Sequence, residues 1–283
     1  MKKNILIPTD FSENAWNAIA YAADLYKNTS CNFYIINAFT GSGYNLNDMA
    51  VAEPGSRTYE NSKSHAERGM NNLKDLIKLR PPNTNHSYTY ISEYNDPLNA
   101  MSTVIEKRDI ALVIMGTKGA TNLSGRLFGS HTINVMENLR NCPVLGVPAN
   151  SNFVHLKEIV FPTSFKTHYK RSELIHLVEI AQLHLANICV LHVGDADKLG
   201  QVQIDGKQLL ASSLEGASFT FHHISSSAVT DGVQRFAESR ESDMVAFINK
   251  KHAFFGSIFT NPMVKELGMF SKVPLLVMHD ERN

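Results

Sequence analysis

Residues 109–148 read DIALVIMGTKGATNLSGRLFGSHTINVMENLRNCPVLGVP, and this stretch decides the fold. Positions 110–115 form a continuous apolar run without alternation, which is typical of a strand buried on both faces of a parallel sheet. Apolar residues follow at roughly helical spacing over 131–140, and 143–147 reads as another buried strand. The stretch therefore predicts a strand, a loop, a helix and a closing strand.

The loop between the first strand and the helix contains Gly116, Gly119 and Gly129, the last followed by Ser130. Glycine lets the backbone approach a ligand closely or adopt positive φ, and the first turn of a helix presents unpaired N–H groups at the positive end of the helix dipole. Ser130 is expected to cap the helix, and Ile133 then stands where a capping box needs Glu or Gln. The loop predicts a phosphate site, with an ordinary turn loop as the alternative.

The spacing Gly116-x-x-Gly119, nine residues, Gly129-Ser130 resembles the nucleotide-binding signature of the universal stress protein (UspA-like) family. The strand at 143–147 is similar to that family's last strand. The resemblance covers most of 1–148 and, more weakly, the rest of the chain. It implies an ATP or AMP site, with or without Mg²⁺, in which the two close glycines and Gly129-Ser130 surround the phosphates and ribose.

The resemblance also implies contacts at the ends of the first two strands. It places Asp10 near the base and ribose, with Pro8 and Thr9 beside it as further candidate contacts, and it assigns an adenine contact to the backbone of Ala38. The alternative for Asp10 is that it caps the helix that follows it.

Two further contacts are implied beside the glycine loop. The Met115 backbone would flank the ribose and His131 the phosphate, although the family often has a small or β-branched residue at the histidine position, and a solvated histidine is the alternative. Asp10 and Gly116 both follow strands, so they face one crevice if those strands are neighbours in a parallel sheet.

Strands alternate with helices along the chain, and the pattern occurs twice. The segments 158–165, 219–221, 243–248 and 273–276 mirror 4–11, 88–90, 109–114 and 142–145. We therefore expect two tandem α/β domains, 1–150 and 151–283, each a doubly wound, five-stranded parallel sheet flanked by helices. The family resemblance implies the same fold, Rossmann-like and similar to the adenine nucleotide alpha hydrolases.

The second copy has lost the predicted site. By this alignment Asp10 becomes Ser164, Gly116 and Gly119 become Lys250 and Ala253, Gly129-Ser130 becomes 260–261, and the loop is three residues shorter. The basic run at 250–252 either binds an anion in another way or is solvated. We expect the second half to be a degenerate scaffold.

Composition excludes several classes of protein. Lys plus Arg and Asp plus Glu both total 27, and a formal charge of zero argues against a general nucleic-acid binder. No apolar run is long enough for a transmembrane helix, and the first residues do not form a signal peptide. Cys31, Cys142 and Cys189 lie at or in predicted strands without zinc-like spacing, which indicates core residues in a reducing compartment. A cytoplasmic protein is expected.

The histidines do not predict a metal centre. His168, His176 and His184 recur along one predicted helix at a spacing that rotates about 80° per step, so they share no face. His222 and His223 point to opposite sides of a strand. No pair has the helical i, i+4 spacing of a zinc site, and the chain has no Walker A sequence.

The sequence favours a regulatory stress-response protein that binds ATP or AMP in its first half. The alternatives are a slow ATPase or adenylyl-handling enzyme, and an interaction module that binds no nucleotide. The two closing strands, 143–147 and 274–278, are apolar edge strands and are expected to pair within the chain, as the family pairs them in dimers. Further homodimerisation stays open, and no protein partner is identified.

Overall fold

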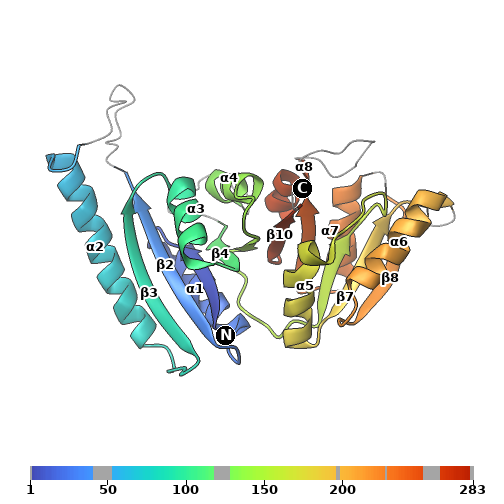
Figure 1. Cartoon of the computed structure of the whole chain (residues 1–283), viewed down its shortest axis with the longest axis horizontal. Helices are drawn as coiled ribbons and strands as arrows, with labels where there is room; N and C mark the ends of the chain where they lie inside the picture. The colour runs from blue at the N-terminus through green and yellow to red at the C-terminus, as the bar shows by residue number, and fades with distance from the viewer. Residues whose placement is uncertain are drawn as a thin grey trace.

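The structure is a computed structural model and describes residues 2–40, 53–117, 128–195, 198–226, 228–250 and 262–280. One ten-stranded sheet runs through this part of the chain in the order β3-β2-β1-β4-β5-β10-β9-β6-β7-β8 (Figure 1). Each set of five strands is parallel and has the same order, 3-2-1-4-5 in its own count. The predicted α/β fold is confirmed; the division of the chain at residue 150 stays a prediction.

The predicted strands at 110–115 and 143–147 are present with small shifts at their ends. The first half contains β1 (Lys3–Pro8), β2 (Cys31–Phe39), β3 (His86–Tyr94), β4 (Leu112–Gly116) and β5 (Val144–Val147). The second half contains β6 (Glu158–Pro162), β7 (Asn187–Val193), β8 (Phe219–Ile224), β9 (Met244–Asn249) and β10 (Leu275–His279).

Helices cover both faces of the sheet, and alternate strand residues face each layer. Ile5 and Ile7 belong to the core cluster on the face covered by α1 (Glu13–Leu25), α2 (Arg57–Lys78), α5 (Arg171–His184) and α6 (Gln201–Ser213). Leu6 belongs to the core cluster on the opposite face, which is covered by α3 (Pro97–Arg108), α4 (Ser130–Asn138), α7 (Val229–Ser239) and α8 (Pro262–Phe270). The sheet is therefore doubly wound, as the alternation of strands and helices predicts.

The two halves meet through their closing strands. β5 and β10 pair antiparallel, with Gly146 opposite Leu275, so the expected pairing within the chain is present. Arg140 reaches across this seam, donates to the backbone oxygen of Asn249 at 3.1 Å and forms an ion pair with Asp280. The apolar edges predicted for each half thus cover one another.

The strand register corrects the alignment of the two halves. Ile5 lies opposite Leu112, and Ile159 lies opposite Met244, so Leu112 and Met244 are equivalent. The alignment of 109–114 with 243–248 is therefore wrong by two residues, and the residue at the Gly116 position is Ile248. Apolar runs of this kind match in several registers, and only the pairing to a neighbouring strand selects one.

The following helices fix the end of the glycine loop. Leu139 N donates to Val135 O after α4, and Ser271 N donates to Leu267 O after α8. This equivalence places Asn261 at the Gly129 position. The loop therefore has the same length in both halves, and the prediction that it is three residues shorter in the second half is wrong.

Two smaller expectations also have outcomes here. Cys31, Cys142 and Cys189 are all free and buried, as predicted for core residues. His168 precedes α5 instead of lying in it. Among the described residues, no three His, Cys, Asp or Glu side chains gather as metal ligands, and no helix is long and apolar enough to cross a bilayer.

Candidate functional site

A cavity of about 380 Å³ opens at the carboxyl ends of β1, β2 and β4. The strand order reverses between β1 and β4, and the carboxyl edge at such a switch point is where doubly wound sheets bind ligands. The sides of the cavity come from the starts of α3 and α4. The predicted residues that line it are Pro8, Thr9, Asp10, Ala38, Met115, Gly116 and His131.

The turn after β1 holds Asp10 by short-range hydrogen bonds. Phe11 adopts positive φ, and its N–H donates to Thr9 Oγ1 at 3.0 Å. Asp10 Oδ1 accepts from the N–H of Ser12 at 3.1 Å and from its hydroxyl at 2.6 Å. Ser12 itself caps α1 by accepting from Ala15 N at 3.2 Å. The alternative that Asp10 caps α1 is therefore wrong, and its carboxylate is positioned at the rim of the cavity.

The first turn of α4 has no side-chain cap. Gly129 is the N-cap residue and Ser130 is the first helical residue, so the prediction of a serine cap is wrong by one position. Gly129 has φ −75°, so its backbone conformation does not require glycine. Without a capping side chain, the first-turn amides and the positive end of the dipole can bind an anion.

Two polar side chains that the sequence did not identify fix the walls of the cavity. Thr132 Oγ1 donates to the Gly116 backbone oxygen at 3.0 Å, which ties the first turn of α4 to the end of β4. Asn37 Nδ2 donates to Thr9 O at 2.8 Å and ties β2 to the end of β1. Both residues line the cavity. They lie near predicted strand ends or helix starts, but no motif marks them.

Gly116 has a packing role that the glycine pattern did not predict. A Cβ atom at this position would lie 2.6 Å from the backbone oxygen of Asn14, in the first turn of α1. Gly116 therefore allows α1 to pack closely on the end of β4. Gly129 and Ser130 adjoin the cavity in sequence without lining it, and Gly119 lies outside the described residues.

The start of α3 supplies a wall that was also missed. Asp96 caps this helix by accepting from Leu98 N and Asn99 N at 3.0 and 3.2 Å, and Pro97 occupies the first turn. Leu98 and Met101 then present apolar side chains to the cavity. Their positions along α3 could be predicted from the cap, but their direction toward the cavity depends on the helix packing.

The second half repeats the turn but not its chemistry. Ser164 takes the place of Asp10, is buried, and accepts from Lys166 N at 3.3 Å. Lys250 donates to the His168 backbone oxygen at 3.1 Å and forms an ion pair of 3.6 Å with Glu173, whose side chain is 2% exposed. Of the basic run, Lys250 is therefore part of the packing around α5 and is not simply solvated, whereas 251 and 252 lie outside the described residues.

Comparisons with known proteins agree with this geometry. The profile described as the universal stress protein family matches residues 1–148. A universal stress protein of Methanocaldococcus jannaschii is 31% identical over 146 residues, which cover 51% of this chain and 81% of that protein.

Solved structures match the whole fold. A universal stress protein of Archaeoglobus fulgidus has a TM-score of 0.70 at 14% identity, with 97% of each chain covered. A functionally unknown protein of Pseudomonas aeruginosa PAO1 has a TM-score of 0.61 at 12% identity, covering 98% of this chain and 92% of that one. The structural likeness supports the fold, and the profile match, which spans half of the chain, shows that this chain belongs to the universal stress protein family.

Proposed function

We propose that this chain binds one adenine nucleotide, ATP or AMP, in the first-half cavity and acts as a regulatory protein in a stress response. The observation that carries the proposal is the cavity at the carboxyl edge of β1, β2 and β4, inside the residues that match the family. Its volume of about 380 Å³ is in the range of small-molecule sites.

The lining suggests how the nucleotide lies. Ile36, Leu98 and Met101 offer apolar contact area for a base beside the backbone of Ala38. The phosphates would lie toward the uncapped first turn of α4, where backbone N–H groups and the helix dipole favour negative charge. Asp10, between these two ends, would accept hydrogen bonds from ribose hydroxyls.

The second half supports a stoichiometry of one nucleotide per chain. Ser164 replaces the Asp10 carboxylate, and a hydrogen bond to a charged group contributes about 1.5–3 kcal/mol. At 1.4 kcal/mol per decade, this replacement alone weakens binding roughly 10- to 100-fold. His192 stands where Asn37 does, bonded to Thr163 O at 3.1 Å and stacked on Phe165, so the wall of the second crevice is also different.

A regulatory role fits the lining better than an enzymatic one. Phosphoryl transfer requires a positioned nucleophile and usually carboxylates that hold a metal near the phosphates. Asp10 and Asp96 are the carboxylates that line the described part of the cavity; Asp96 caps α3, and Asp10 is bonded to Ser12. We therefore infer that occupancy of the cavity, and not turnover, changes what the protein presents to a partner. That Mg²⁺ accompanies the nucleotide, and that the protein is cytoplasmic, stay predictions.

The first test is direct. Freshly purified protein is denatured, and the supernatant is analysed by mass spectrometry for adenine nucleotide. Calorimetric titration with ATP and AMP then compares the wild type with Asp10→Asn and with Ser164→Ala, the equivalent position in the second half. We expect about one site per chain, roughly tenfold weaker binding in Asp10→Asn because the charged acceptor is lost, and no change in Ser164→Ala.

Each rival has its own signature in these experiments. Two equal sites per chain, or binding that Ser164→Ala weakens as much as Asp10→Asn does, would place nucleotide in the second half. Protein that contains no nucleotide and shows no heat with ATP or AMP would favour the nucleotide-independent interaction module. Steady ADP release at enzyme-like rates would favour the slow ATPase.

A further inference from the structure

A second cavity lies in the half that lacks the predicted nucleotide site. It has a volume of about 450 Å³ and opens between α7, α8 and the starts of β9 and β10. Its walls include the buried side chains of Val233, Val245 and Leu267. The lining comes entirely from the second half, and none of its residues lines the first cavity.

The repeat explains why this cavity exists. Ile110 N donates to Ile105 O where α3 ends, and Ser242 N donates to Ala237 O where α7 ends, so these two pairs are equivalent. Ser271 is equivalent to Leu139 by the matching bond after α8. Three buried aliphatic residues of the first half are therefore replaced in the second half: Ile105 by Ala237, Ile110 by Ser242 and Leu139 by Ser271.

These replacements leave space and also place hydroxyl groups in it. Ile105, Ile110 and Leu139 belong to the core on the α3–α4 face, and each counterpart has a shorter side chain. All three counterparts line the cavity, and each is less than a tenth exposed. A packed interior normally excludes voids of this size, because lost contacts destabilise the fold. Retained space of this kind is typical of a ligand site.

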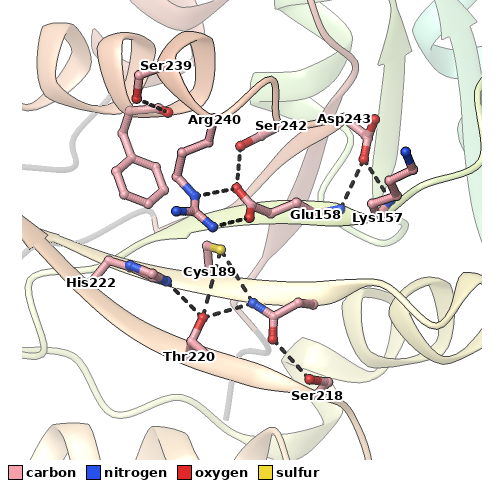
Figure 2. Close-up of polar contacts among 12 residues, drawn as sticks. Lys157, Glu158, Cys189, Ser218, Thr220, His222, Ser239, Arg240, Ser242 and Asp243 are labelled. Carbon is pink, nitrogen blue, oxygen red and sulfur yellow. Dashed lines mark hydrogen bonds and ion pairs between the residues drawn. The ribbon is translucent and has the colours of Figure 1, made fainter.

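The hydrogen bonds decide which ligand groups fit. Ser242 Oγ donates to Glu158 Oε1 at 2.7 Å, and Arg240 Nε holds the same oxygen at 2.8 Å (Figure 2). Ser271 Oγ donates to Val273 O at 2.8 Å. Both hydroxyl protons are therefore committed to the protein, whereas the hydroxyl oxygens retain lone pairs as acceptors. The two serine oxygens in the lining can therefore accept hydrogen bonds from a ligand.

Charged residues lie at the entrance of this cavity. Glu238 and Lys272 line the cavity and pair with each other at 3.3 Å; the Lys272 side chain is largely exposed and that of Glu238 about half exposed. Glu241 is the other charged residue in the lining. The entrance therefore carries a small net negative charge, which disfavours an anionic ligand such as a nucleotide or a fatty acid.

We propose that this second-half cavity is a binding site for a small, uncharged, mainly hydrocarbon molecule that carries one hydroxyl or N–H donor, such as an indole or a phenol. The aliphatic walls bury the ring, and a serine oxygen accepts the donor. The volume is sufficient, since an apolar cavity of roughly 150 Å³ can hold benzene. The site is independent of the nucleotide proposal.

Indole is the probe, and indene is the matched ligand that lacks the N–H donor. Binding is measured on the full chain by saturation-transfer NMR and isothermal calorimetry. The wild type should bind indole with a Kd on the order of 0.1 mM, and indene several-fold more weakly. Ala237→Ile with Ser271→Leu restores the first-half residues, fills the cavity, and should weaken indole binding at least tenfold.

Two further variants keep the test decisive. Ala237→Val fills less space and should weaken indole binding several-fold even if the double variant is overpacked. Ser212→Leu adds an apolar side chain on the exposed face of α6 and should bind like the wild type. Absence of saturable indole binding by the wild type, undiminished binding by folded Ala237→Val, or an equal loss in Ser212→Leu would overturn the proposal. Equal affinity for indene would overturn the assignment of the serine oxygens as acceptors.

Discussion

Replacing Gly116 by Ala is expected to destabilise the fold, because the new Cβ would lie 2.6 Å from Asn14 O and 2.9 Å from Asn14 C. Both atoms belong to the backbone of the first turn of α1, so no side-chain rotation relieves the overlap. Overpacking of this kind costs typically 1–3 kcal/mol. For a chain of this size, that cost lowers the thermal midpoint by about 2–6 °C.

Gly200→Ala is the matched control for this measurement. Gly200 has φ −74°, and no atom lies within 4 Å of the position that an alanine methyl group would take, so alanine meets no overlap there and loses only the preference for glycine over alanine at a helix N-cap. Circular dichroism melts and urea titrations of both variants and the wild type give the comparison. Gly116→Ala should also weaken nucleotide binding, since a displaced α1 moves the turn that holds Asp10. Wild-type stability in Gly116→Ala would refute the close contact as the reason for this glycine.

Burial lowers the pKa of both His176 and His279 to about 4. Nearby positive charge contributes to this shift, from Lys3 beside His176 and from Arg140 beside His279. Because the unfolded chain binds these protons more readily, the free energy of unfolding should fall as pH drops from about 6.5 toward 4, by up to about 3 kcal/mol per histidine. Urea titrations of His176→Gln and His279→Gln should show a shallower pH dependence than the wild type. Phe128→Ala should cost about 3–5 kcal/mol in the same assay, with partial rescue by Leu, because this fully buried ring packs on glycines of both β5 and α8. With ATP and Mg²⁺, ADP release should stay below about one per minute, against roughly 10 s⁻¹ for a typical enzyme, and faster release that Asp10→Asn abolishes would contradict a binding role.

Much of the fold could be predicted from the sequence because its local signals agree. The continuous apolar run at 110–115 and the Asp96-Pro97 pair each specify one kind of element, and the structure has β4 and α3 there. The candidate site was predicted best at the carboxyl ends of strands, where Asp10 and Ala38 lie. Asn37 and Thr132 were missed because their roles are hydrogen bonds to backbone oxygens that only the assembled sheet brings near.

The corrected register gives a physical account of how the two halves diverged. Gly116 accommodates the first turn of α1, and Ile248 at the equivalent position carries a side chain into the same layer of the core. α1 begins three residues after Asp10, whereas α5 begins seven residues after Ser164. The later start of α5 leaves room for the Ile248 side chain, because the backbone of an additional first turn would occupy the space that this side chain takes. The loss of one glycine therefore accounts for a displaced helix start beside the second crevice, and Lys250 then binds His168 O in the extended segment that replaces that turn.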